Sequence, residues 1–405
     1  MNDSNEQITT WLILPVWGRE HLDFALRYSI PTLLAPNNIP AMLKYMRTEF
    51  VFICPRNEVN YIRSFPAYLE LSKIIPCRFF EQPPIGEDGY RHSYDRFTAY
   101  YNLVVSHQDV VPGKTGFLFL TADIMLGDGS LATLASKVVD EGYRAILVPG
   151  PRATLETFLD DYSDRLNAKG SPLNNRELAG LFLNNIHEIT RSFIVGEPEI
   201  SNDYPIHYYE RINSETLVFR NFVYHPLYLR PLRKISNIGA TIDHILIPES
   251  VTKLSKLWFA LDSDELFCIT LAETGYDQGY VDRRSKNDIQ IIRAFRNWLK
   301  DGWATGFHLW LATKKGIIHS GEITEGTLNS SYRIDKIVQK IYKKESFTPS
   351  VVEGADNYFK LVVPWVIKKR RTLLQRLRLN VARSHFFPFR IVRSILHNFK
   401  KITSK

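Results

Sequence analysis

The chain has 405 residues, of which 44% are hydrophobic and 23% charged, as in folded globular proteins with a sizeable core. Its three cysteines are scattered without a CxxC spacing, which argues against a disulfide scaffold and a structural zinc site. The N-terminus is polar and no apolar run is long enough to span a bilayer, so we expect a cytoplasmic protein without a secretory signal.

The net charge of +8 is distributed unevenly along the chain. Residues 357–405 contain 13 Lys or Arg and no Asp or Glu, which leaves 38 basic and 43 acidic residues in the first 356. A mildly acidic body with one basic segment lacks the broad basic surface of a nucleic-acid-binding protein. We therefore expect no nucleic-acid partner.

Apolar strands alternate with helical segments through the first 150 residues. The predicted strands are 11–17, 50–54, 77–81, 117–121 and 144–148, and the predicted helices are 20–34, 93–108 and 131–141. Pro31 is expected to bend or end the first helix, and Asp128 or Ser130 to cap the third. Almost wholly apolar strands between helices predict an α/β fold, a doubly wound and mostly parallel sheet with helices on both faces.

The pattern changes to a mixed α+β part after Gly150. Residues 151–194 are expected to be mainly helical, with a break at 169–172. Further predicted strands are 215–224, 241–247 and 266–271, and further predicted helices are 286–300, 305–313 and 331–343.

Mostly parallel sheets bind ligands at the carboxyl ends of their strands. The segments to inspect are therefore 15–19, 55–57, 82–91 and 122–128. Asp123 stands two residues beyond a predicted strand, where a carboxylate and phosphate oxygens together can coordinate Mg²⁺ or Mn²⁺. An ordinary loop carboxylate is the alternative for Asp123, and helix capping is the preferred interpretation of Asp128.

Three segments carry a resemblance to a known family. Phe-Leu-Phe-Leu-Thr-Ala-Asp, residues 117–123, resembles the hydrophobic strand and Asp-x-Asp segment of glycosyltransferases of the GT-A fold. Leu-Ile-Leu-Pro-Val-Trp-Gly-Arg-Glu, residues 12–20, is similar to their first strand and nucleotide-binding turn, and residues 17–41 resemble glycosyltransferases of bacterial surface-polysaccharide clusters. The resemblance covers residues 11–150 and implies a GT-A-like, Rossmann-like sheet that binds a nucleotide sugar.

The sequence departs from the family at the Asp-x-Asp segment. The first Asp of the family falls on Thr121 and the last on Asp123. Thr121 could donate a hydrogen bond to a ribose hydroxyl, whereas a single carboxylate leaves the dependence on Mg²⁺ or Mn²⁺ open.

The resemblance also implies a set of donor-binding residues. It places Pro15 and Trp17 beside the nucleobase, with Trp17 as a stacking platform, although an aromatic residue at a strand end is as often part of the core. The remaining implied contacts are Arg19 in the turn and Asp95 and Arg96 on the helix that begins at 93. Arg91 and Arg96 could bind the diphosphate, and solvated surface charge is the plainer interpretation.

Two acidic segments are candidates for catalysis. An inverting transfer needs a carboxylate that accepts the proton of the acceptor hydroxyl, and the family draws this base from the half after the Asp-x-Asp segment. Asp264, Asp243 and Asp262 are the candidates, and His244 or His225 could complete a metal site with Asp123. Each could instead be a turn or capping residue.

The segment from Lys368 alternates cations with aliphatic and aromatic residues. This composition favours an amphipathic helical tail on an anionic membrane surface, and a helix docked on the body is the alternative. We expect residues 1–150 to bind the nucleotide sugar, 151–356 to complete the same domain with the acceptor and catalytic part, and 357–405 to associate with the membrane.

These observations together predict a glycosyltransferase that moves a sugar from a nucleotide donor to a polysaccharide or lipid-linked acceptor at the cytoplasmic membrane face. A sugar nucleotidyltransferase is one alternative, but the turn at 15–19 lacks the Gly-rich basic loop of that class. A non-catalytic GT-A-like module that recruits partners to the membrane is another, favoured by the missing Asp.

Overall fold

The computed structural model describes the chain at residues 7–82, 93–197, 201–202, 206–236, 242, 247, 250–276, 281–282, 286–300 and 306–347. All of these belong to one compact unit, residues 1–362. The basic tail at 357–405 lies outside the described residues, as do Arg91, Asp243 and His244. None of the helices in the described ranges has the length and apolar character of a membrane span.

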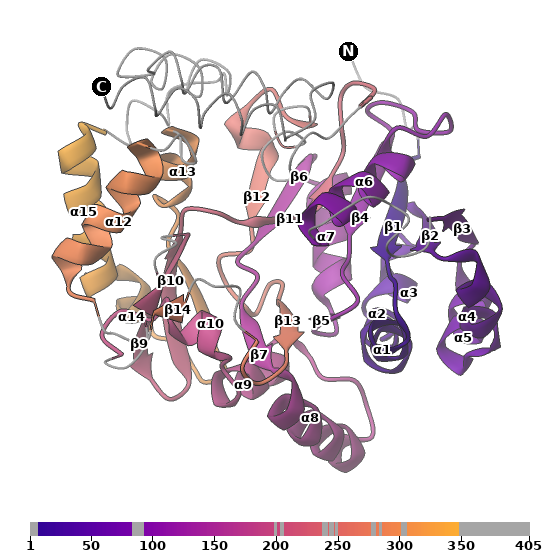
Figure 1. Cartoon of the computed structure of the whole chain (residues 1–405), viewed down its shortest axis with the longest axis horizontal. Helices are drawn as coiled ribbons and strands as arrows, with labels where there is room; N and C mark the ends of the chain where they lie inside the picture. The colour runs from indigo at the N-terminus through magenta and orange to yellow at the C-terminus, as the bar shows by residue number, and fades with distance from the viewer. Residues whose placement is uncertain are drawn as a thin grey trace, which may run out of the picture. The chain divides into compact units, whose positions relative to one another are not determined.

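Seven strands of the described residues form the main sheet, in the order β12-β6-β11-β4-β1-β2-β3 (Figure 1). All pair in parallel except β11, which is antiparallel to both of its neighbours. The predicted fold class, a mostly parallel α/β sheet, is therefore confirmed. Their bounds are β1 Thr9–Pro15, β2 Arg47–Cys54, β3 Cys77–Glu81, β4 Thr115–Phe119, β6 Ala145–Val148, β11 His225–Leu229 and β12 Leu257–Phe259.

The main sheet is buried on both faces, because successive side chains of a strand point to opposite sides. Trp11 and Ile13 of β1 join an apolar cluster with α6, α8 and α9, whereas Leu12 and Leu14 join a second cluster with the helices of residues 19–42 and with α7. Helices thus cover both faces, as expected. Their bounds are α1 Arg19–Phe24, η1 Ala25–Ser29, α2 Ile30–Leu33, α3 Ile39–Met42, α6 Ser93–Val105, α7 Ser130–Val139, α8 Leu155–Lys169 and α9 Asn175–Asn184.

Smaller sheets and helices complete the described fold. Sheet β5-β13-β7 comprises Ile124–Leu126, Cys268–Ala272 and Arg152–Thr154, sheet β15-β10-β9 comprises Gly316–His319, Thr216–Asn221 and His207–Asn213, and β14-β8 comprises Val281–Asp282 and Ser201–Asn202. The other helices are η2 Arg56–Glu58, α4 Val59–Ser64, α5 Pro66–Ile74, α10 Glu188–Arg191, η3 Leu254–Lys256, α12 Asp288–Lys300, α13 Gly306–Leu311, α14 Glu325–Asn329 and α15 Arg333–Glu345.

The first helix does not end at Pro31, which was one of the two outcomes expected there. Helical backbone continues from Arg19 to Leu33, and its middle section, Ala25–Ser29, is a π-helical turn. Proline cannot donate the backbone hydrogen bond of an α-helix, and its ring crowds the carbonyl four residues earlier. The wider π turn removes this conflict, so the helix passes through the proline.

Two further expectations are wrong. Ile242 and Ile247 are helical, where a strand was predicted for 241–247, because a short apolar run does not by its periodicity distinguish a strand from a buried helix. Asp128 and Ser130 do not cap α7. The N-cap position is Gly129, at φ 108° and without a side-chain cap.

Asn38 fastens the loop that leads from β4 to α7. Its side chain is fully buried and donates to the carbonyls of Thr32 (2.7 Å) and Gly127 (3.2 Å). It also accepts from the backbone N–H groups of Gly129 (3.2 Å) and Leu131 (2.9 Å). The Asn38 side chain therefore accepts hydrogen bonds from N–H groups at the start of α7, a role that a capping side chain usually has.

Neighbouring contacts hold the rest of this loop. The Ser29 hydroxyl, at the end of the π turn, donates to the Ala122 carbonyl at 2.5 Å. Asp128 accepts from the backbone N–H and the side-chain amide of Asn37, at 2.7 and 2.9 Å. Residues 29–38 thus position the loop that carries Asp123.

We expect Asn38→Ala to lower the free energy of unfolding by about 3 kcal/mol, because it leaves several buried backbone groups without partners. Asn37→Ala is the matched control. The Asn37 side chain is exposed, so its loss should cost less than about 1 kcal/mol. Urea denaturation of both variants measures the difference, and equal costs would contradict the role given to Asn38.

Candidate functional site

The strands β1, β2 and β4 end at one edge of the main sheet. Their registers align Pro15 with Ile53 and Ile13 with Phe119. Because β11 runs in the opposite direction, it begins at this edge, with His225 opposite Val148. The carboxyl ends of β1 and β4 and the beginning of β11 therefore lie at the same edge of the sheet (Figure 1). The candidate residues next to these strand ends are thus on one side of the fold.

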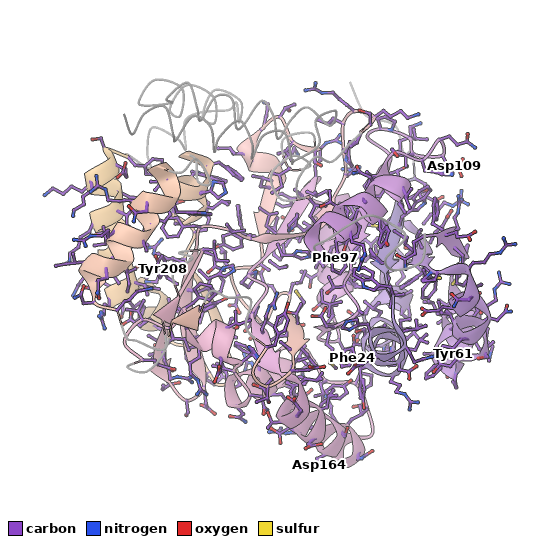
Figure 2. The ribbon with its side chains drawn as sticks, viewed as in Figure 1. Phe24, Tyr61, Phe97, Asp109, Asp164 and Tyr208 are labelled. Carbon is purple, nitrogen blue, oxygen red and sulfur yellow. The ribbon has the colours of Figure 1, made fainter. Side chains whose placement is uncertain are left out.

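Trp17 lies half-buried just beyond β1. Its ring contacts two aromatic rings of α6, with centroid distances of 4.8 Å to Phe97 and 5.6 Å to Tyr100 (Figure 2 labels Phe97). The guanidinium carbon of Arg96 is 5.4 Å from the Trp17 ring centre. The structure thus brings two predicted donor residues together, while Pro15 is buried at the strand end.

Arg19 is exposed and makes its contacts on the side of η2 and α4. Its guanidinium carbon lies 3.5 Å from the centre of the Tyr61 ring. Burial raises the pKa of Glu58, and the charge of Arg19 partly opposes this rise. Asp95 lies in the first turn of α6, and its side chain is outside the described part.

Three buried polar atoms that follow strands at this edge have no hydrogen-bond partner among the described residues: Glu58 Oε2 after β2, Gln82 Oε1 after β3 and Thr121 Oγ1 after β4. The side-chain NH₂ group of Gln82 donates a hydrogen bond to the Val16 carbonyl at 2.9 Å. This bond does not use the side-chain oxygen of Gln82. Buried polar atoms normally have partners, so these three can bind a polar ligand or ordered water at the edge.

Asp123 is half-buried in the loop between β4 and β5. Its backbone carbonyl accepts from the Leu271 N–H of β13 at 3.1 Å. Its carboxylate is close enough to Tyr101 to add to the effect of burial, and both raise the pKa of that phenol. Asp123 thus has a backbone position fixed by β13 beside the carboxyl edge of the sheet.

His225 begins β11 at this edge. Its Nε2 lies 3.5 Å from the carbonyl oxygen of Phe119, the last residue of β4. Of the two histidines considered as metal ligands, it is the one whose surroundings are described, because His244 lies outside these residues.

A separate cluster forms where β12 ends. Asp262 Oδ1 and Asp264 Oδ2 lie 3.0 and 3.7 Å from Nε2 of His319, the last residue of β15. Burial opposes protonation of His319, but hydrogen bonds with Asp262 and the Gly321 carbonyl outweigh it and raise its pKa. Burial acts to raise the pKa of Asp262, whereas hydrogen bonds from His319 and the Asp264 N–H lower it overall.

Arg176 of α9 binds the same cluster. Its guanidinium donates to both carboxylate oxygens of Asp264 and also contacts Glu322. Sequence reasoning selected Asp262 and Asp264 but missed His319 and Arg176. The sequence around each residue does not indicate a role in this cluster. His319 ends an apolar strand, and Arg176 lies on a helix that is distant in sequence from Asp262 and Asp264.

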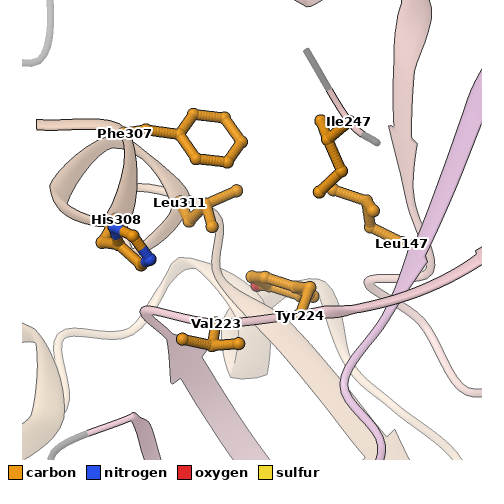
Figure 3. A pocket seen from close by; sticks show the side chains of 7 residues that line it. All are labelled: Leu147, Val223, Tyr224, Ile247, Phe307, His308 and Leu311. Atoms are coloured by element: carbon orange, nitrogen blue, oxygen red, sulfur yellow. The ribbon is translucent and has the colours of Figure 1, made fainter. Parts of the chain in front are cut away.

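A small pocket lies between β6, the residues just before β11, and α13 (Figure 3). Its lining is mostly apolar and its enclosed space is far too small for a nucleoside diphosphate sugar. The lining residues are Leu147, Val223, Tyr224, Ile247, Phe307, His308 and Leu311.

No protein-family model and no curated protein matches the chain. Among solved structures, residues 1–349 of S. aureus TarS give a TM-score of 0.29 at 10% identity, over 83% of this chain and 72% of that one. GalNAc-T7 with UDP, GalNAc and Mn²⁺ gives 0.36 at 10% identity, over 86% and 58%. Mouse xyloside xylosyltransferase 1 gives 0.24 at 12% identity, over 39% and 59%.

These are partial similarities. The chain spans less than three fifths of the length of GalNAc-T7 and of the xylosyltransferase, at 58% and 59%. The function proposed below therefore rests on the chain's own residues.

We expect Thr121→Val to leave the free energy of unfolding unchanged or to raise it by up to about 1 kcal/mol, because the substitution removes a buried hydroxyl without a partner. Thr115→Val, at the start of β4, is the control. Its hydroxyl oxygen accepts from the Val111 N–H at 3.0 Å, so its loss should cost about 1–2 kcal/mol. Denaturant titration measures the free energy of unfolding of both variants. A loss of stability in Thr121→Val as large as in Thr115→Val would show that the Thr121 hydroxyl has a hydrogen-bond partner in the folded protein.

Proposed function

We propose that this protein is a glycosyltransferase that binds a nucleotide-sugar donor at the carboxyl ends of β1, β2 and β4. The observation that carries the proposal is the partnerless Thr121 hydroxyl on the same sheet edge as Trp17 and Asp123. One aromatic face, one hydroxyl and one carboxylate supply three different contacts, for the base, the ribose and the diphosphate with its cation.

Each part of the donor has a matching group in this proposal. Trp17 offers a half-buried ring that packs at an angle against Phe97 and Tyr100 of α6, and a base can stack on such a ring. Thr121 and Gln82 offer buried polar atoms to ribose hydroxyls. Arg96 adds positive charge beside Trp17, where a diphosphate needs it.

Asp123 would hold the cation that neutralises the diphosphate. Mg²⁺ or Mn²⁺ prefers carboxylate and phosphate oxygens, and stabilising the departing nucleoside diphosphate lowers the barrier to transfer. His225, next to the end of β4, is the proposed nearby imidazole, with His244 as the alternative.

In the transfer, the bond between the anomeric carbon and the donor phosphate oxygen breaks while the acceptor oxygen bonds to that carbon. The acceptor hydroxyl proton passes to a carboxylate base, which is most effective when its pKa lies near the working pH. The lowered pKa of Asp262 makes it a weak base, and both carboxylate oxygens of Asp264 already accept hydrogen bonds from Arg176. We therefore favour Asp243 among the three candidates.

The acceptor is proposed to be a polysaccharide or a lipid-linked glycan at the cytoplasmic membrane face. Support comes from the sequence of residues 357–405, with 13 cations and no acidic residue. Cations near an anionic membrane surface contribute about 1 kcal/mol each, so this segment could keep the enzyme beside a lipid-linked acceptor.

We expect nucleotide sugars to stabilise the wild-type protein against heat, by about 2.7 kcal/mol at one hundred times the dissociation constant. UDP sugars with Mn²⁺ are the first probes, because GalNAc-T7 was solved with UDP, GalNAc and Mn²⁺. Asp123→Asn should abolish most of this stabilisation, measured by differential scanning fluorimetry across a panel of nucleotide sugars.

Asp164→Asn, on the exposed side of α8 (Figure 2), is the matched control and should respond like wild type. The proposal fails if no nucleotide sugar stabilises the wild type, or if Asp123→Asn and Asp164→Asn respond alike. Donor binding without sugar release or transfer to any glycan would instead favour a non-catalytic module.

We expect the fourfold substitution of Lys368, Lys369, Arg370 and Arg371 by Gln to weaken binding to vesicles containing phosphatidylserine by at least about tenfold, because it removes four attractive charges. Co-sedimentation of the full chain at low and high salt measures this. Binding that is insensitive to both salt and substitution would contradict a membrane role for the tail.

A further inference from the structure

We propose that Arg230, Arg144 and Lys256 form a binding site for a phosphate group at the amino edge of the main sheet, the edge at which β4, β6 and β12 begin. Arg230 follows β11, and Arg144 and Lys256 precede the neighbouring strands β6 and β12 (Figure 1). The proposal concerns an anion that binds without nucleotide, so it stands whether or not the chain transfers a sugar.

The pairing of the strands brings the three cationic residues next to one another. Strands β11 and β12 both pair with Ala145 of β6. One residue closer to the amino edge, the Arg230 N–H donates to the Arg144 carbonyl at 2.8 Å, and the Arg144 N–H donates to the Lys256 carbonyl at 2.9 Å. Opposite residues of an antiparallel pair have side chains on the same face, so Arg230 and Arg144 share one face of the sheet.

The ammonium group of Lys256 lies beside the start of β6. A Cβ atom added at Gly142, two residues before Arg144, would be 3.3 Å from Lys256 Nζ. The Lys256 charge is therefore close to the backbone that leads into Arg144.

The observation that carries the proposal is the burial of Arg230. This residue is only 9% exposed, and its Nε atom is buried without a hydrogen-bond partner among the described residues. Its Nη1 atom lies 3.5 Å from the Gly113 carbonyl, at the limit of a hydrogen bond. An arginine side chain keeps its charge at neutral pH, and a buried charge without a counter-ion is costly.

The described residues supply no counter-ion for Arg230, since none of their ion pairs includes it. The Tyr228 hydroxyl is close but cannot serve, because burial raises the pKa of this phenol and the charges of Arg230 and Arg144 only partly oppose the rise. Like charges directly opposite each other in an antiparallel pair also repel. An anion bound between Arg230 and Arg144 would remove both costs.

The acidic residues that precede Arg144 are engaged with α7. Asp140 accepts a hydrogen bond from the Ser136 hydroxyl at 2.8 Å, and Glu141 pairs with Lys137 at 2.8 Å. The loops at the amino edge instead add exposed cations, which are Lys114, Arg233, Lys234 and Lys253. The edge therefore attracts anions.

A phosphate monoester fits three cations of this kind. A guanidinium group presents a planar pair of donors to two phosphate oxygens, and an ammonium group adds a third contact as a point charge. Arg144 and Lys256 are half-buried, so a ligand can enter from their side and reach the deeper Arg230. A soluble phosphate ester and the headgroup of a lipid present the same oxygens, and the experiment below distinguishes them.

The proposed site is separate from the donor site. At the carboxyl edge Val148 of β6 pairs with His225, whereas Arg144 lies four residues earlier, about 13 Å away along a strand. A phosphate at the amino edge therefore does not occupy the place proposed for the nucleotide diphosphate.

The test is the effect of inorganic phosphate on the melting temperature of the full chain without nucleotide, with sodium chloride of equal ionic strength as the reference. We expect phosphate to stabilise the wild type, and the fitted dissociation constant to rise at least about tenfold in Arg230→Met, because a charge-assisted contact is lost. Arg293→Met is the matched control. Arg293 is exposed on α12, so this variant should respond as the wild type does.

Lys256→Gln is a second variant, at a half-buried position, and we expect it to weaken phosphate binding by at least about threefold. It decides the question if Arg230→Met does not fold, which near-ultraviolet circular dichroism verifies. The inference is overturned if phosphate stabilises the wild type no more than chloride does. It is also overturned if folded Arg230→Met, or in its place Lys256→Gln, responds like Arg293→Met.

Vesicles containing phosphatidic acid distinguish the two sources of the phosphate group. They are co-sedimented with a chain in which residues 368–371 are replaced by Gln, with and without Arg230→Met. A loss of vesicle binding in Arg230→Met assigns the site to a lipid headgroup. Equal vesicle binding, together with Arg230-dependent binding of inorganic phosphate, assigns it to a soluble phosphate ester, and either result supports the phosphate site.

Discussion

The buried side chain of Asn38 is the contact on which the candidate donor site most depends. It binds two carbonyls and two N–H groups, and so joins the segment after the π turn to the beginning of α7. Together with the Ser29 hydroxyl on the Ala122 carbonyl, it fixes both ends of the loop that carries Asp123. A carboxylate that is to meet a diphosphate needs this kind of fixed backbone.

The parts of the fold that were predictable from the sequence are those with continuous apolar runs. Strands such as β2 and β4 and helices such as α6 were evident from hydrophobic pattern, because burial on both faces demands it. The π turn before Pro31 and the helical Ile242 and Ile247 were not. They depend on packing that no local pattern records.

The candidate site was predictable to a similar degree. Trp17, Thr121 and Asp123 follow strands, so the rule that parallel sheets bind ligands at carboxyl ends was sufficient to select them. His319 and Arg176 meet Asp262 and Asp264 only through tertiary structure. The partnerless state of Thr121 Oγ1 is likewise a property of the folded chain, and buried atoms elsewhere, such as Trp310 Nε1, share it.

A crystal structure of the protein with UDP or GDP and Mn²⁺ tests the account of the donor site most directly. We predict that the base stacks on Trp17, that a ribose hydroxyl lies within hydrogen-bonding distance of Thr121 Oγ1, and that the diphosphate and its cation lie beside Asp123. A nucleotide bound away from the carboxyl ends of β1 and β4, with Thr121 Oγ1 still without a partner, would contradict the account.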